Sequence, residues 1–313
     1  MLGRVADQLY WMGRYSERTE NMARILDVAD RMTLTPQSDE TRQSAWTSAL
    51  EVAGALDGYD EVHGDINSAD VLHYLALDPD NPSSIYSTIR TARENARALR
   101  GSITTETFES INATWLELQG MDAAALNGAA RRPFFEWVKE RAHLFRGVAK
   151  GTMLQDEAMC FMDIGLYTER ADSTARLLDS KYHILLPASE EIGGAMDYYQ
   201  WGALLRSLSA FRAYHKIYRD RISARRVADL VILNAQMPRS LRFCYDRLTE
   251  TLEEICGTNA PECQRIAGKL QSWVRYRRIE DIFADGLHEF LTEFIEGNAE
   301  MGQQLQRDFM MVR

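Results

Sequence analysis

The sequence predicts an all-α fold, a helical bundle built from two tandem pseudo-symmetric repeats, on the basis of three observations. Only seven prolines occur in 313 residues, so long stretches are free of helix breakers. Apolar residues recur with helical spacing, and no stretch keeps the alternation of a β-strand for long. A fifteen-residue motif that begins at Gly13 returns 152 residues later at Gly165, with eight identical positions.

The helices of the first half are bounded by turn and capping residues. Pro36 follows the first helix, Pro79 and Pro82 precede another, and Ser83-Ser84 supplies an N-cap for it. Thr104 opens the next helix. The expected helices are 2–33, 38–57, 67–77, 85–100 and 104–118, then a loop or short helix over 120–133, then long helices over 134–150 and 153–183.

The second half begins with a connection marked by proline and glycine at 187–194. Further helices are expected near 196–221, 223–235, 238–256, 261–276 and 279–309. Segments of the two halves correspond at a nearly constant offset, since Trp46 matches Trp201 and the segment 71–85 matches 227–241. We therefore expect a single domain over 1–313, made of repeat one at about 1–152 and repeat two at about 153–313.

Composition excludes several classes of protein. No apolar run approaches the roughly 20 residues of a membrane span, and Arg4 and Asp7 interrupt any signal peptide. The net charge of −10 disfavours binding to nucleic acid. Two basic runs, 219–226 and 275–278, lie among acidic residues and are interpreted as solvated helix faces. Four cysteines without a C-x-x-C pattern suit a reducing compartment, so a cytoplasmic location is expected.

The repeated motif places an adjacent Glu-Arg pair inside each of two helices. Glu17-Arg18 belongs to the first copy and Glu169-Arg170 to the second. On a helical wheel Arg18 falls near the centre of an apolar stripe, where its permanent charge needs an anion as a partner. Each copy also carries a glycine four residues before the glutamate, which is expected to make room for another helix or for a ligand.

These charged residues have three interpretations. In a structural network, Glu17 pairs with Arg170 and Glu169 pairs with Arg18. In a ligand site, the arginines hold a carboxylate or phosphate and the glutamates hold an amine; the arginines are Arg18, Arg24, Arg170 and Arg176. In the third interpretation the pairs are unrelated surface charges.

The stretch from Met1 to Arg24, with its Glu-Arg motif, resembles the alpha-E family, a bacterial all-helical domain of unknown function. The stretch Ala92–Arg100, followed by Thr105-Glu106 and Asn112, resembles a second signature of that family. The resemblance covers essentially the whole chain. It departs in the second copy, where Leu166 stands in the place of Arg14.

The resemblance implies partners rather than chemistry. Members of the family occur beside, or fused to, circularly permuted ATP-grasp ligases and transglutaminase-like proteins. This setting implies a role in a predicted system of peptide synthesis or modification. It assigns no activity to the domain itself.

The segment 93–97 allows two interpretations. Arg93 and Arg97 share one side of a helix while Asn95 faces elsewhere. Either they form a solvated face in which Glu94 pairs with its neighbours, or Arg93 or Arg97 reaches the region of Glu17 and Glu169 and completes a polar pocket.

A carboxylate-bridged two-metal bundle is a weaker alternative. Such bundles combine one glutamate from each of two helices with Glu-x-x-His from two others. The candidates here are Glu140, His143, Asp285 and His288, together with Glu17 and Glu169. Spacing by three residues is common in acidic helices, so no metal is expected.

We expect a helical accessory or substrate-presenting partner of an ATP-grasp ligase. The first alternative is an enzyme acting on amide or peptide substrates, with glutamates as general bases and arginines as carboxylate clamps. The other is a scaffold without a ligand. The sequence contains no phosphate loop and no recognised hydrolase motif, so no cofactor is expected.

Overall fold

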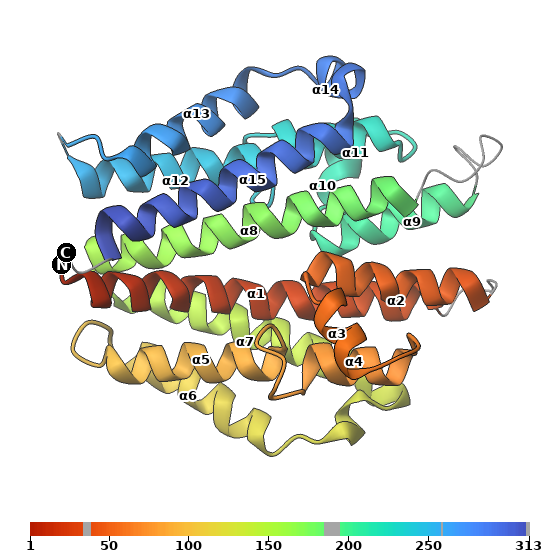
Figure 1. Cartoon of the computed structure of the whole chain (residues 1–313), viewed down its shortest axis with the longest axis horizontal. Coiled ribbons are helices and arrows are strands. Elements are labelled where there is room, and N and C mark those ends of the chain that lie inside the picture. Colours follow the sequence, from red (N-terminus) through yellow and green to blue (C-terminus); the bar gives the residue numbers. More distant parts are fainter. Residues whose placement is uncertain (34–38, 185–194, 258, 311–313) are drawn as a thin grey trace. The chain divides into compact units, whose positions relative to one another are not determined.

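The computed structural model describes residues 1–33, 39–184, 195–257 and 259–310, and within these ranges it contains helices and no strands (Figure 1). The predicted all-α fold is confirmed. The chain divides into two compact units. Unit 1 comprises Met1–Glu169 with the last residues from Phe309 onward, and unit 2 comprises Arg170–Asp308. The division of the chain into two sequence repeats stays a prediction.

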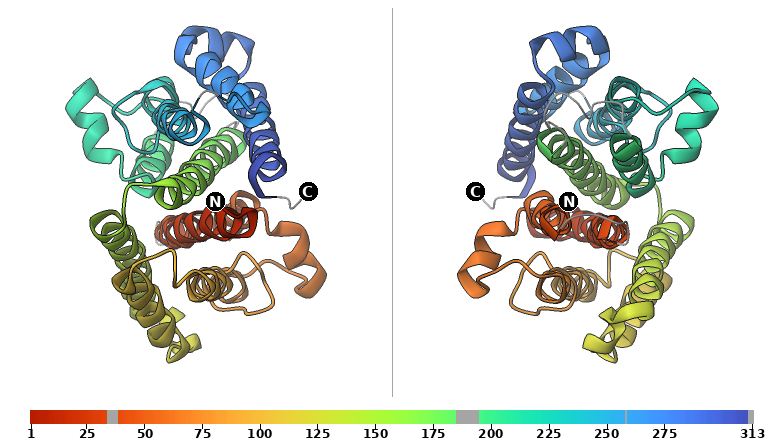
Figure 2. Two further views of the ribbon diagram at one scale, coloured as in Figure 1. Left: turned by 90° about the vertical axis from the view of Figure 1, so that its left-hand side faces the viewer. Right: turned by 90° about the vertical axis from the view of Figure 1, so that its right-hand side faces the viewer.

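Unit 1 is organised around its first helix. The helix α1 packs along α5 on one side and α7 on another, as the end-on views show (Figure 2). The helices of this unit are α1 (Gly3–Thr33), α2 (Asp39–Ala53), α3 (Leu56–Val62), α4 (Ser68–Ala76), α5 (Ile85–Ala98), α6 (Thr105–Gln119), two short turns at Ala123–Leu126 and Gly128–Ala130, α7 (Arg131–Thr152), and α8 (Glu157–Ile184) as far as Glu169.

Unit 2 contains the remainder of α8 and shorter helices. Within it α13 packs against both α12 and α15, and α11 packs against α12. Its further helices are α9 (Ala195–Ser207), α10 (Phe211–Tyr218), α11 (Ala224–Leu233), α12 (Leu241–Cys256), α13 (Glu262–Tyr276), α14 (Ile279–Asp285) and α15 (Leu287–Leu305), which ends in a wider turn at Gln306–Met310.

Three helices predicted as continuous are broken, and those predictions were wrong. The predicted helix 38–57 ends before Gly54, 196–221 is interrupted at Ser209, and 279–309 is interrupted at Gly286. Each of these residues has a positive φ, of 61°, 54° and 107° respectively. A residue in this conformation cannot continue a right-handed helix. The predicted connection at 187–194 lies outside the described residues.

The predicted caps of unit 1 are present. The Ser84 hydroxyl accepts a hydrogen bond from the Ser87 amide at 3.0 Å, and Thr104 does the same for the Thr107 amide at 3.3 Å. These contacts satisfy amides that a helix leaves unpaired in its first turn. The two side chains fix where α5 and α6 begin.

The core of α1 mixes apolar and polar side chains. Leu9, Met12 and Leu26 are fully buried, as expected for a central helix. A buried polar set accompanies them: Ser16, Glu17, Thr19, Glu20 and Asn21. Carboxylates are almost never fully buried unless they are paired. No helix among the described residues is long and apolar enough to cross a membrane.

Candidate functional site

Glu169 of α8 is held by two arginines of α1, and all three residues belong to unit 1. Arg18 donates from Nε to Oε1 at 2.6 Å and from Nη2 to Oε2 at 3.0 Å. Arg14 donates from Nε to Oε2 at 2.7 Å. Arg14 also donates to the hydroxyl of Tyr10, a side chain that is buried in the same core. Both carboxylate oxygens of Glu169 are therefore bound by guanidinium groups.

This clamp determines the charge of Glu169. Burial of the side chain would raise its pKa, but the charges of Arg18 and Arg14 and their hydrogen bonds outweigh burial and lower the pKa to about 2. The carboxylate is consequently ionised at neutral pH. A general base is most effective with a pKa near the working pH, so Glu169 is poorly suited to that role.

The two motif glycines bring the backbones of α1 and α8 into direct contact. A Cβ placed on Gly13 would lie 2.1 Å from the carbonyl oxygen of Met162, and one placed on Gly165 would lie 2.0 Å from that of Tyr10. No side chain fits at either distance. The space expected for a helix or a ligand is thus occupied by the other helix, which positions Glu169 within reach of Arg14 and Arg18.

Glu17 and Glu20 form a second charged group on α1, and both side chains are fully buried. Arg146 of α7 pairs with both carboxylates, at 3.2 Å in the case of Glu17. Arg24 pairs with Glu20 at 2.6 Å, and His143 Nε2 lies 3.2 Å from the same carboxylate. One guanidinium from α7 thus serves two carboxylates that have no exposure to water.

Further ion pairs continue along α1 and α7 and form a charge ladder. Lys139 lies 3.3 Å from Asp27, and Arg131 lies 2.9 Å from Asp30. As the residue numbers rise along α1, those of the paired residues on α7 fall, which is the pattern expected for antiparallel helices. We use the name charge ladder for the acidic residues Glu17, Glu20, Asp27 and Asp30 of α1 with Arg131, Lys139, His143 and Arg146 of α7.

The structure places the remaining motif residues as follows. Arg18 and Glu169 form the pair that the structural network requires, and Glu17 contacts Arg146. In unit 2, Arg170 donates to the carbonyl of Pro238 at 3.4 Å, and Arg176 pairs with Asp172 one turn before it at 2.7 Å.

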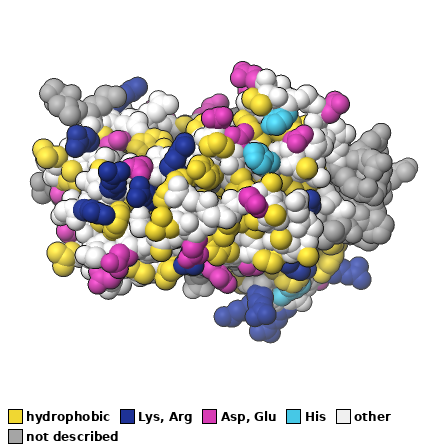
Figure 3. All heavy atoms as spheres, turned by 90° about the horizontal axis from the view of Figure 1, so that it is seen from below, with side chains coloured by type: hydrophobic (Ala, Val, Ile, Leu, Met, Phe, Trp, Pro, Cys, Tyr) yellow, Lys and Arg dark blue, Asp and Glu magenta, His cyan; other side chains and the backbone are white. Residues whose placement is uncertain are grey.

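The segment 93–97 on α5 forms a partly solvated face. Arg93 donates to Asn112 at 3.1 Å and also pairs with Glu94, and Arg97 lies 3.5 Å from the same glutamate with 64% of its side chain exposed. Asn95 is half-buried on the same helix. On the face of the molecule that carries α5 and α6, basic side chains are interspersed with acidic and apolar ones (Figure 3). Glu94 therefore pairs with its neighbours, and Arg93 and Arg97 do not complete a pocket with Glu17 and Glu169.

The residues considered as metal ligands have other contacts. His143 faces Glu20, His288 Nδ1 lies 2.7 Å from Asp179, and Asp285 pairs with Arg277 at 3.0 Å. Glu140 is exposed on α7. Across the described ranges, no three histidine, cysteine or carboxylate side chains gather in a way that could hold a metal ion.

Three residues at the centre of unit 1 were not predicted as site residues from the sequence. Arg14 stands out in the sequence only because the second copy lacks it, and neither Glu20 nor Arg146 belongs to a predicted constellation. Glu20 lies three residues after Glu17 and shares a helix face with it. Arg146 lies three residues after His143 on α7. The spacing of these residues is visible in the sequence, but the pairing of α1 with α7 is not.

Comparison with protein families places these helices in context. A family model described as "Alpha-E: a predicted alpha-helical domain with a conserved ER motif" matches residues 1–310. The dipeptide Glu-Arg occurs in this chain at Glu17-Arg18, Glu140-Arg141 and Glu169-Arg170.

Relatives occur among mycobacterial proteins. An uncharacterized protein of Mycobacterium bovis and one of a Mycobacterium tuberculosis strain are each 28% identical over 328 residues, and one of a second M. tuberculosis strain is 27% identical. Each match covers 94% of this chain but only 35% of the relative, so the chain spans about a third of the length of these curated relatives. No solved structure matches.

Proposed function

Since this chain belongs to the Alpha-E family, we propose that it is a non-catalytic helical partner that docks on an ATP-grasp ligase or presents the substrate of that ligase. The system it serves would synthesise or modify peptides. Supporting this proposal, matching relatives are about three times longer than the matched region, as expected of a module that works with other domains.

The observation that carries the proposal is the state of Glu169. A pKa of about 2 and two bound arginines make this carboxylate too weak a base to take up a proton near neutral pH. Glu17 is fully buried against Arg146. The alternative of an amide-directed enzyme needs one of these glutamates as a general base, so the contacts favour a supporting role over a catalytic one.

We further propose that the chain consists of two tandem repeats. The glycine contacts are reciprocal at an offset of 152 residues, because Gly13 meets Met162 while Gly165 meets Tyr10. The caps of α5 and α12 also correspond. Ser240 accepts from the Phe243 amide at 3.0 Å and donates to the carbonyl six residues before it, as Ser84 does in α5.

Co-purification with an ATP-grasp ligase of the same organism tests the docking proposal. The two full-length proteins are co-expressed, and the complex is followed by size-exclusion chromatography. We expect co-elution that survives exposed substitutions such as Arg97→Gln. Complete separation of two well-folded proteins at micromolar concentration would overturn the proposal.

The double variant Glu17→Gln/Glu169→Gln distinguishes a structural role of the two glutamates from a catalytic one. If both residues hold the fold together, the variant loses its cooperative thermal transition. A variant that keeps the native transition but loses a ligand or an activity would favour the enzyme alternative.

A further inference from the structure

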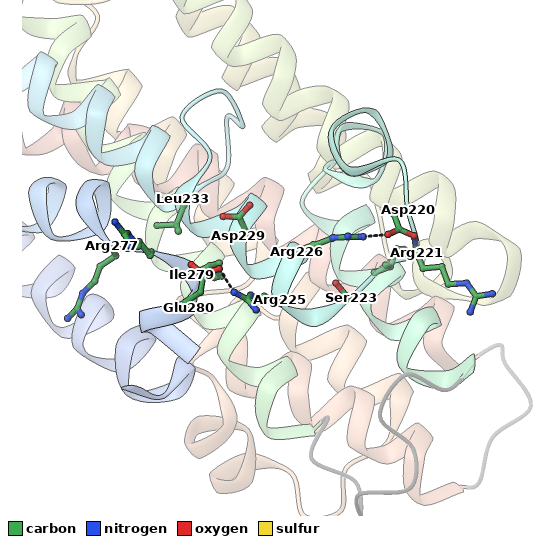
Figure 4. A pocket seen from close by; sticks show the side chains of 12 residues that line it. Asp220, Arg221, Ser223, Arg225, Arg226, Asp229, Leu233, Arg277, Ile279 and Glu280 are labelled. Carbon is green, nitrogen blue, oxygen red and sulfur yellow. Dashed lines mark hydrogen bonds and ion pairs between the residues drawn. The ribbon is translucent and has the colours of Figure 1, made fainter. Parts of the chain in front are cut away.

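The two basic runs singled out in the sequence lie on the same cavity of unit 2. The segment 219–226 enters α11, and the segment 275–278 links α13 to α14. Residues from both line a cavity of about 880 Å³ (Figure 4). The cavity contains five arginines, namely Arg221, Arg225, Arg226, Arg277 and Arg278. The two runs are therefore more than unrelated solvated faces.

The acidic side chains of this cavity are all engaged. Asp220 binds Arg226, Glu280 binds Arg225, and Asp229 accepts a hydrogen bond from the hydroxyl of Tyr218. Burial of Tyr218 and its bond to Asp229 raise the pKa of the phenol, so the hydroxyl keeps its proton and remains the donor. Arg277 in turn pairs with Asp285, which does not line the cavity. Five guanidinium groups against these four carboxylates leave a small local excess of positive charge in a chain whose net charge is −10.

Two of the arginines form no ion pair with a carboxylate among the described residues. Neither Arg221 nor Arg278 lies within ion-pair distance of an acidic group in the part of the chain that the structure describes, and both are exposed. In Figure 4 the side chain of Arg221 extends outward beside Asp220, while Arg225 and Arg226 point toward Glu280 and Asp220. Arg221 and Arg278, whose charges act on Asp220 and Glu280 without forming an ion pair at bonding distance, thus flank two ion pairs on one concave surface.

Those ion pairs are readily exchanged. The side chains of Arg225 and Glu280 are 54% and 60% exposed, and those of Arg226 and Asp220 are 42% and 55% exposed. Exposed ion pairs contribute little to stability because water competes for both charges. An incoming anion can replace the carboxylates without breaking the fold.

We propose that this cavity binds a small molecule that carries a phosphate or pyrophosphate group. Guanidinium groups bind phosphate oxygens through paired hydrogen bonds, and several of them together suit a multiply charged anion. The volume lies within the range of small-molecule sites. Ile222 and Ile279, both nearly buried, and Leu233 supply apolar surface for the remainder of the ligand. The site is independent of the Glu-Arg helices and of docking to a ligase.

Isothermal titration calorimetry of the full chain tests the site. The probes are inorganic phosphate, inorganic pyrophosphate, glycerol 3-phosphate, citrate and a short oligonucleotide, at low ionic strength. We expect saturable binding of the phosphate compounds at one site per chain. The double variant Arg221→Gln/Arg278→Gln should weaken pyrophosphate binding by at least about tenfold, because two charge-assisted donors are lost.

A charge-matched control is available in the same unit. Arg247 and Arg265 are exposed and pair with glutamates of their own helices. The variant Arg247→Gln/Arg265→Gln should keep the affinity of the natural chain. Conversely, Glu280→Gln removes a competing carboxylate from Arg225 and should tighten binding.

The outcomes separate the possible sources of the phosphate. Tighter binding of glycerol 3-phosphate than of inorganic phosphate identifies an organic phosphate as the ligand, and equal binding identifies the free anion. The proposal fails if no probe binds saturably, if citrate binds as tightly as pyrophosphate, or if both double variants lose affinity equally. Binding of a short oligonucleotide but of none of the small phosphates would also overturn it.

Discussion

Glu169 illustrates how a single buried carboxylate can be kept ionised. Two guanidinium groups from α1 bind its two oxygens, and their charges more than offset the cost of burial. Removing one partner of a buried pair leaves the other uncompensated, which typically costs about 3–5 kcal/mol.

The variant Glu169→Gln should therefore be strongly destabilised at neutral pH. Its free energy of unfolding is expected to fall by about 3 kcal/mol, the order set by a pKa near 2 in the folded chain against 4.5 for an unperturbed glutamate. Urea denaturation followed by circular dichroism measures the change. The exposed Glu94→Gln serves as a control and should change stability little.

The same pair has a defined pH dependence. Because folding lowers the pKa of Glu169, its stabilisation is complete above about pH 4.5 and disappears as the pH falls toward 2. The gap in stability between the natural chain and Glu169→Gln should narrow over that range. A gap that stays constant from pH 7 to pH 3 would contradict the assigned pKa.

The close backbone contact at Gly13 leads to a separate prediction at the residue scale. Since a Cβ there would lie 2.1 Å from a backbone oxygen, Gly13→Ala must push α1 and α8 apart in unit 1 and lower the melting temperature. Gly147 lies inside α7 with open space around it. Gly147→Ala should raise stability by up to about 1 kcal/mol through helix propensity. Equal effects of the two substitutions in differential scanning calorimetry would argue against the close contact.

At the scale of elements, the charge ladder joins α1 to α7 with ionic contacts where apolar packing is usual. Arg146 is central to it, because its guanidinium contacts both Glu17 and Glu20. The sequence could show that α1 carries charge on an apolar face. It could not identify α7 as the partner, since that depends on how the chain folds back over more than 100 residues.

Helix boundaries, too, could be predicted from the sequence only in part. Ser84 and Thr104 are recognisable caps, and the structure uses both. The breaks at Ser209 and Gly286 escaped prediction because a positive φ at serine carries no sequence signature, and an isolated glycine is tolerated within helices.

Arg146→Gln should destabilise the chain by about 3–5 kcal/mol, because two buried carboxylates would lose a shared cation. Arg141 is the matched control on the same helix, since it pairs with the exposed Glu117. Arg141→Gln should cost less than about 1 kcal/mol. Chemical denaturation of both variants measures the difference, and similar losses would mean that the charge ladder contributes no more than a surface pair.

At the scale of the whole chain, the reactivity of the cysteines measures how well the core around them is closed to solvent. All four are buried, and none forms a disulfide among the described residues: Cys160, Cys244, Cys256 and Cys263. Burial raises the pKa of the Cys256 and Cys263 thiols, and the nearby Asp308 raises them further. Thiols of this kind are poor nucleophiles because the thiolate is the reactive form.

The native chain should therefore react slowly with an aromatic disulfide reagent, and all four thiols should react after denaturation. Added reductant should leave the melting temperature unchanged. Rapid labelling of any thiol in the native chain would show that the core around it opens, and a melting temperature that depends on reductant would indicate a disulfide.

The Glu169 clamp also has a consequence for synthesis of the chain. Arg14 and Arg18 precede their common carboxylate by 155 and 151 residues. At translation rates of roughly 5–20 residues per second, they wait about 8 to 30 s before Glu169 is made. During that interval the two arginines of the nascent N-terminal helix lack their shared carboxylate, so the clamp can form only after more than half of the polypeptide has been synthesised.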